Sequence, residues 1–159
     1  MAWSMKTEGL TELSEMLGQL ADQAEKVASG ALFDGAGIVA DALNSAVNSI
    51  QTEPFIYKKN HRLPSPEEKA ALRGKIGIAK FRKNGSEVDT IIGLTGDAGY
   101  TQLGNRKTAV VEIARSINSG TSFMTKQPVF RKAARSVSSA AKAAMIAKAD
   151  QMIEEITGK

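Results

Sequence analysis

The sequence predicts a single α+β domain, with helices at both ends and a β-hairpin between them. Three patterns lead to this prediction. Apolar residues recur at helical spacing in the first 50 residues, and short alternating segments flank an Asn-Gly pair in the middle of the chain. A helical stripe returns in the last 30 residues. A chain of 159 residues fits one domain, which we expect to cover residues 1–159.

Two helices are expected before residue 51. The first, over residues 10–28, carries one apolar stripe made of Leu10, Leu13, Leu17, Leu20, Ala24 and Val27. The second stripe runs from Leu32 to Ile50. Because a glycine weakens a helix interior by up to about 1 kcal/mol, Ser29-Gly30 predicts a kink or a break between them. Gly35 and Gly37 are candidates for close packing.

Residues 52–64 contain two prolines and a basic run, and we interpret them as a long exposed loop. Ser65, Pro66 and Glu68 then form a helix start, with Ser65 as N-cap, Pro66 at the first position and Glu68 completing a capping box. This short helix should end at Gly74.

A β-hairpin is expected between residues 75 and 94. Asn84-Gly85 favours a type I′ turn, in which both residues adopt positive φ. Phe81 is out of phase with Ile76 and Ile78, which predicts a bulge or a register change in the first strand.

Residues 96–107 are interpreted as a loop, followed by a helix that ends at Gly120. We expect the inward side chains of that helix to be Val110, Val111, Ala114 and Ile117. A last, continuous helix should start after Pro128, carry a stripe from Phe130 to Ile156 and end at Gly158.

The residue inventory argues against an enzyme. There is no cysteine, and the only histidine, His61, stands among cations in a loop. No Gly-Lys-Ser/Thr phosphate loop occurs, and the carboxylate pairs at 67–68 and 154–155 suit solvated helix ends. We therefore expect no catalytic residues, no metal and no cofactor. The start of the chain lacks signal-peptide features, so we expect a soluble protein made in the cytoplasm.

Charge is unevenly divided along the chain. Residues 1–53 hold two Lys against eight acids, a balance of −6, and residues 54–159 hold nineteen Lys or Arg against nine acids, a balance of +10. Complementary surfaces of neighbouring subunits would explain this division, and we favour that interpretation. A nucleic-acid face is the alternative.

Cations are densest over residues 57–83. Phosphate contacts from such a stretch would be salt-sensitive and independent of sequence. Stacking platforms would need interleaved aromatics, and only Tyr57 and Phe81 are available. The stretch is either a solvated charged loop or the lining of a DNA channel. The residues that would face DNA or a channel are Lys58, Lys59 and Arg62.

Three segments, in order, resemble the phage minor tail-component family, the neck or tail-completion proteins of long-tailed bacteriophages. Residues 6–13 are similar to its Gly-Leu-x-x-Leu helix entry, and residues 72–76 to its Leu-Arg-x-Ser-Ile strand entry. Residues 117–122 and 127–133 resemble its Val-Glu-aromatic-Gly-Thr … Gln-Pro-Phe-x-Arg-Pro-Ala segment. Asn118 and Lys132 depart from the glutamate and the proline that are usual there.

The resemblance implies a structural virion protein at the head–tail junction, in the role of neck, tail-completion or tail-terminator subunit. Such a subunit would form a homo-oligomeric ring that joins the connector to the tail tube and leaves a channel for genomic DNA, with no membrane contact. Residues implied at a subunit or partner interface are Gly120, Thr121, Gln127, Pro128 and Phe130. The same segment can equally be a turn and helix cap alone. The alternative function is that of a small, basic, non-specific DNA-binding protein.

Overall fold

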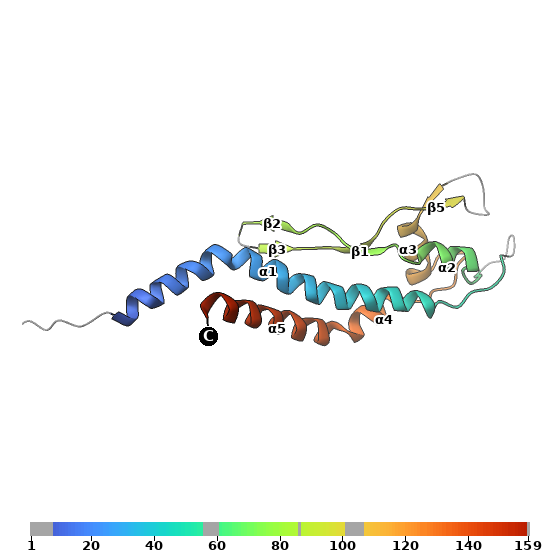
Figure 1. The fold of residues 1–159 in the computed structure, drawn as a ribbon. Coiled ribbons are helices and arrows are strands. Elements are labelled where there is room, and N and C mark those ends of the chain that lie inside the picture. Colours follow the sequence, from blue (N-terminus) through green and yellow to red (C-terminus); the bar gives the residue numbers. More distant parts are fainter. Residues whose placement is uncertain (1–7, 56–60, 86, 101–106, 159) are drawn as a thin grey trace, which may run out of the picture.

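The computed structural model describes residues 8–55, 61–85, 87–100 and 107–158 (Figure 1). It is 62% helical and 14% strand, and its helices and small antiparallel sheets form the predicted single α+β domain.

The N-terminal region is one continuous helix, α1 (Glu8–Asn48), of 41 residues. Of the two predicted alternatives near Ser29-Gly30, the break is therefore wrong, whereas a bend along α1 is visible in Figure 1. Gly30 and Gly35 meet the side chains of Met152 and Met145 in the last helix, and a Cβ at either glycine would collide with them. Tertiary packing thus offsets the low helix propensity of glycine. A Cβ on Gly37 would meet no atom within 4 Å, so the close packing expected at Gly37 is not found.

The C-terminal region holds two helices where one was predicted. Helix α4 (Val129–Ser136) and helix α5 (Ser138–Thr157) are separated at Val137, which has φ −104° and ψ 1°. Helix α5 runs antiparallel to α1, because Met145 lies at Gly35 and Met152 at Gly30. Helix α5 ends at Gly158 as predicted, and Gly158 has the left-handed conformation at φ 69°.

The hairpin is confirmed and consists of two paired segments. Strands β1 (Ile76–Ile78) and β4 (Ile92–Leu94) form its base, and β2 (Arg82–Asn84) and β3 (Glu87–Asp89) form its tip.

A bulge separates the base of the hairpin from the tip. Between the pairs Ile78–Ile92 and Arg82–Asp89, three residues of the first arm oppose two of the second. The bulge that Phe81 predicted is thus present. The turn differs from the prediction at Asn84, which still pairs with Glu87 and does not have positive φ, whereas Gly85 has φ 66°.

Helix α2 (Pro66–Leu72) has the predicted capping box between Ser65 and Glu68, and Gly74 follows it at φ 65°. A side chain of this helix also caps the C-terminal end of α1. The Lys69 ammonium donates to the carbonyl oxygens of Asn48 and Ile50 at 2.8 Å each. A cation there stabilises the negative end of the α1 dipole.

Residues 96–107 are not simply a loop. This part of the chain contains strands β5 (Asp97–Tyr100) and β6 (Lys107–Ala109), which pair with each other in antiparallel orientation. Helix α3 (Val110–Ser119) follows and ends at Gly120, with φ 76°. It buries Val110, Ala114 and Ile117 as predicted, whereas Val111 is exposed, contrary to the prediction.

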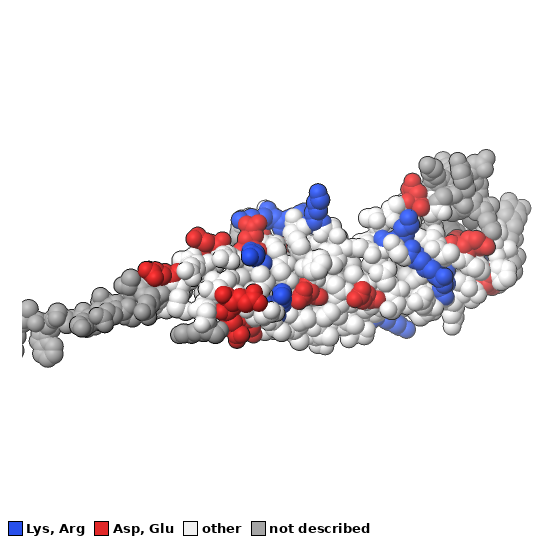
Figure 2. All heavy atoms as spheres, viewed as in Figure 1, with Lys and Arg blue, Asp and Glu red and all other residues white. Residues whose placement is uncertain are grey.

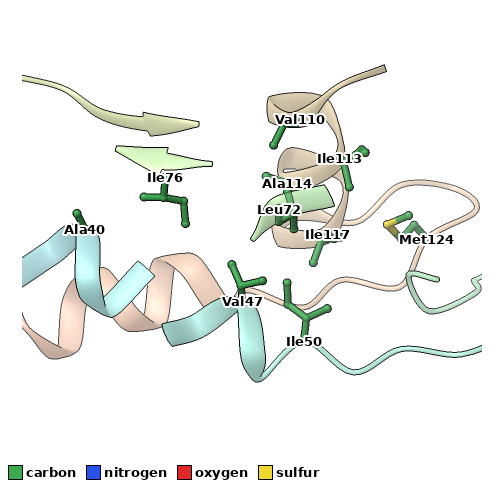
Figure 3. Packing of buried hydrophobic residues seen from close by; sticks show 10 residues of the cluster. All are labelled: Ala40, Val47, Ile50, Leu72, Ile76, Val110, Ile113, Ala114, Ile117 and Met124. Carbon is green, nitrogen blue, oxygen red and sulfur yellow. The ribbon is translucent and has the colours of Figure 1, made fainter. Parts of the chain in front are cut away.

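The hydrophobic core lies where α2 and α3 meet the C-terminal half of α1 and the base of the hairpin (Figure 3). Val47 of α1 and Ile50, which follows the helix, face Leu72 and Ile117 there. Its ten buried members are Ala40, Val47, Ile50, Leu72, Ile76, Val110, Ile113, Ala114, Ile117 and Met124.

The molecule is elongated. Helix α1 lies between the hairpin on one side and α4 and α5 on the other, and its first turns extend beyond both (Figure 1). The core therefore sits near one end of the molecule and the start of α1 at the other.

Candidate interaction surfaces

The segment expected to form an interface, residues 120–130, is held mainly by contacts within the chain. Gly120 donates to the Ser116 carbonyl at 2.9 Å and so caps α3. Thr121 closes the next turn, where its hydroxyl accepts from the Met124 N–H at 3.0 Å.

Gln127 ties this segment to the end of α1. Its side chain donates to the Gln51 carbonyl and accepts from the Gln51 N–H, both at 2.9 Å, while its own N–H donates to Ile117 at 2.7 Å. Pro128 then precedes α4 with φ −77°. The structure thus gives Gly120, Thr121, Gln127 and Pro128 roles in the fold, and an interface role for them stays a prediction.

Arg62 is buried, contrary to the expectation of an exposed basic loop. Only 3% of the residue is accessible, and its guanidinium forms a bidentate pair with Glu68, both bonds 2.7 Å long. Hydrogen bonding to Glu68, opposed by desolvation, raises the pKa of Arg62. Because its charge is neutralised inside the molecule, Arg62 is removed from the candidate DNA-facing residues. Lys58 and Lys59 lie outside the described residues.

Other cations of residues 57–83 are also paired within the chain. Lys69 caps α1, Arg82 binds Asp89 across the hairpin at 2.9 Å, and Lys83 pairs with Glu25 of α1. These internal contacts reduce the charge that the stretch offers to phosphate.

The start of α1 forms an exposed apolar surface. We call residues 8–24 the overhang; within it, the described side chains from Leu13 onward are exposed, except Met16 and Leu20, which are half-buried. Leu13 is 50% and Leu17 58% accessible. Leucines at helical spacing with such exposure are typical of a helix that contacts another protein surface.

A second apolar surface is a groove between the hairpin, α1, α3 and α4, with a volume of about 220 Å³. Leu43, Ile92, Leu94 and Val111 line it, with Phe130 at one side. Of the five predicted interface residues, Phe130 is the one that lines this groove. A cavity of about 150 Å³ already binds benzene, so this groove can accept an aliphatic side chain.

Charges differ between the ends of the molecule. The overhang has four acids and no Lys or Arg, whereas residues 110–136 have five Lys or Arg and one Glu. In Figure 2, Asp and Glu gather over the early part of α1 and the end of α5, and Lys and Arg are prominent over the β2–β3 hairpin.

The described part of the chain offers no metal centre and no membrane span. No group of three or more His, Asp or Glu side chains there could hold a metal ion. Among its helices, none combines the length and the apolar character needed to cross a membrane.

Sequence reasoning identified the apolar stripe of residues 10–27 but not its exposure, because periodicity gives a face and not its partner. It missed the groove entirely. The one available signal in the sequence was Val111. It directly follows Val110, and one face of a helix cannot hold both valines together with Ile113 and Ile117.

Comparisons of the chain with protein-family models, curated proteins and solved structures find no match.

Proposed function

We propose that this protein is a structural subunit of the head–tail junction of a long-tailed bacteriophage, acting as a neck, tail-completion or tail-terminator protein. Copies of it assemble into a ring that joins the connector to the tail tube and surrounds a DNA channel. The role is structural and not catalytic, and its site of action is the virion. The ordered sequence resemblance motivates this proposal.

The observation that carries an assembling role is the overhang. Leu13 and Leu17 each expose about half of their surface. A partner that covers them would be stabilised on the helix by about 25 cal/mol for each Å² of apolar area buried. An elongated shape with unlike ends also suits a ring, whose neighbours touch through different surfaces. Lys58 and Lys59 remain candidates for the channel face.

The test uses a phage that encodes this chain. Removal of the gene should leave filled heads and separate tails, and the purified protein added to such a lysate should restore joined particles in negative-stain images. Joined, infectious particles formed without the protein would contradict the proposal.

The alternative, a small DNA-binding protein, makes a different prediction. The purified protein would retard duplex DNA at low salt, and the effect would decline steeply as salt rises. The internal pairing of Arg62, Arg82 and Lys83 argues against this alternative.

A further inference from the structure

The overhang and the groove are open apolar surfaces of complementary shape. The overhang is a convex ridge on which Leu13 and Leu17 are 50% and 58% accessible. The groove is concave, and α1, the base of the hairpin, α3 and α4 each contribute apolar side chains to its lining. Covering either surface is favourable, because each Å² of apolar area removed from water contributes about 25 cal/mol.

The groove has the size of a site for leucine side chains. A cavity of about 150 Å³ binds benzene. By that measure, a groove of about 220 Å³ has room for about two leucine side chains. Leu13 and Leu17 lie one helical turn apart on one face of α1, so a single overhang can present both of them to the groove.

The overhang of one chain cannot reach the groove of the same chain. Leu17 and Leu43 both belong to α1, and Leu43 lines the groove. At 1.5 Å per residue, the two lie about 39 Å apart along the helix. The first turns of α1 also extend away from the base of the hairpin, α3 and α4 (Figure 1). An overhang that fills a groove must therefore come from another chain.

Charge favours a second copy of this chain as the source of that overhang. The overhang has four acids and no Lys or Arg, so two overhangs repel each other. Among the described residues, the lining of the groove includes no acid and one cation, Arg115. Arg115 is exposed and belongs to none of the ion pairs of the described residues. Arg131, which follows Phe130, is also exposed. A groove of this chain therefore attracts the overhang, whereas another overhang repels it.

The acids of the overhang can stay in water while its leucines are buried. Glu15 and Asp22 lie on the opposite face of α1 from Leu13 and Leu17. Docking therefore does not bury either carboxylate, which would be costly without a partner. The acids act instead through their field, which steers the overhang toward the basic end of another copy and weakens as salt rises.

From these features we propose that the overhang of each subunit docks in the groove of the next copy, with Leu13 and Leu17 as anchors. The inference rests on the proposed function and deepens it, since it names the two surfaces that join neighbours in the ring. The contact is head-to-tail, so its repetition closes a ring or builds a filament. Because it lies between neighbours and not on the ring axis, the channel for DNA stays open.

Two surface variants test this contact in solution. L17D should weaken docking from the overhang, and V111D should weaken docking in the groove, because each places an unpaired carboxylate in an apolar contact. Leu17 and Val111 are exposed in the single chain, so both variants should keep the circular dichroism of the wild type. Light scattering should show oligomers of the wild type at high concentration. Each variant alone should associate at least about tenfold more weakly.

A mixture of the two variants separates head-to-tail docking from every symmetric contact. L17D keeps an intact groove and V111D keeps an intact overhang, so together they should form a dimer of one copy of each that grows no further. Q19D is the matched control; it adds the same charge away from the leucines and should assemble like the wild type. A mixture that stays monomeric would overturn the proposal, and so would a wild-type protein that stays monomeric at high concentration.

Cysteine cross-linking locates the contact, because the chain has no cysteine of its own. Mild oxidation should join L17C to V111C when the two variants are mixed, whereas neither should link to itself. I146C is the matched control for the groove, since Ile146 is 63% accessible but lies on α5, outside the groove. Links of L17C to itself, or to I146C in preference to V111C, would overturn the proposal.

The contact and the proposed function can fail separately. A dimer in the mixture of variants, from a protein that the phage does not need for head–tail joining, would leave the contact standing and remove the proposed function. Dependence of joining on the protein, with no dimer in the mixture, would remove the contact and leave the function.

Discussion

Gly35 and Gly37 lie two residues apart in α1 but in different surroundings. A Cβ on Gly35 would stand 2.6 Å from the Met145 sulfur and 3.2 Å from the Ala141 carbonyl oxygen, and a Cβ on Gly37 would meet nothing within 4 Å. The same substitution should therefore have opposite effects at the two positions.

We expect Gly37→Ala to raise the free energy of unfolding by about 0.5–1 kcal/mol, the usual gain for alanine in a helix. Gly35→Ala should lower it, because overpacking costs about 1–3 kcal/mol and exceeds that gain. Urea unfolding followed by circular dichroism measures both. Equal stabilisation by the two alanines would show that α5 does not pack on Gly35.

The buried pair of Arg62 and Glu68 holds the chain that leads into α2. The Glu68 carboxylate also accepts from the Ser65 N–H at 2.8 Å, and Arg62 lies over the Phe55 ring at 5.2 Å. One carboxylate thus serves the capping box and neutralises a buried cation.

Glu68→Ala should lower the free energy of unfolding by about 3 kcal/mol, because it leaves the Arg62 charge buried without its main partner. Glu67→Ala is the matched control, since the adjacent Glu67 is exposed, and it should change stability much less. Thermal unfolding of the two variants would decide. Similar midpoints for both would mean that Arg62 is exposed in solution, as the sequence alone had predicted.

At the scale of elements, α1 combines two functions in one helix. Its C-terminal half supplies Ala40 and Val47 to the core, while the overhang contributes no buried residue from position 13 to position 24. Stability and assembly should therefore be separable within a single element.

A variant that begins at Ala21 should unfold within about 2–4 °C of the wild-type midpoint, because it loses no core contact and a shift of that size corresponds to about 1 kcal/mol or less. The same variant should fail to self-associate in light scattering. A large loss of stability would indicate that the overhang folds back on the body.

For the whole molecule, the length of α1 dominates the shape. Its 41 residues span about 60 Å at 1.5 Å per residue. A compact chain of 159 residues would have a radius of gyration of about 15 Å.

Small-angle X-ray scattering of a dilute, monomeric sample should give a radius of gyration clearly above about 15 Å and a maximum dimension of at least about 60 Å. A value near that of a compact chain would contradict the extended overhang.

Much of the local structure could be predicted, because it depends on short-range chemistry. The capping box of Ser65 and Glu68, the bulge at Phe81 and the helix ends at Gly120 and Gly158 each depend on a few neighbouring residues. The apolar stripe of the overhang was also readable, because helical periodicity is local.

The predictions that were wrong concern residues whose burial depends on segments distant in the sequence. From the sequence alone, Gly30 is expected to break the helix, but in the structure Met152 packs against it. Arg62 is expected to be exposed, but Glu68 and residues 123–125 contact it. The groove beside Phe130 needs four elements to form. None of these partners can be inferred from spacing along the chain.

The sequence by itself determined the fold class, the hairpin, the caps and an amphipathic first helix, since backbone preferences and side-chain periodicity act over a few residues. Only the tertiary structure decided that α1 is unbroken, that α5 packs on it at Gly30 and Gly35 and that Leu13 and Leu17 stay exposed. The physical reason is that burial depends on which surfaces meet, and a helix face has the same pattern whether a partner covers it or not.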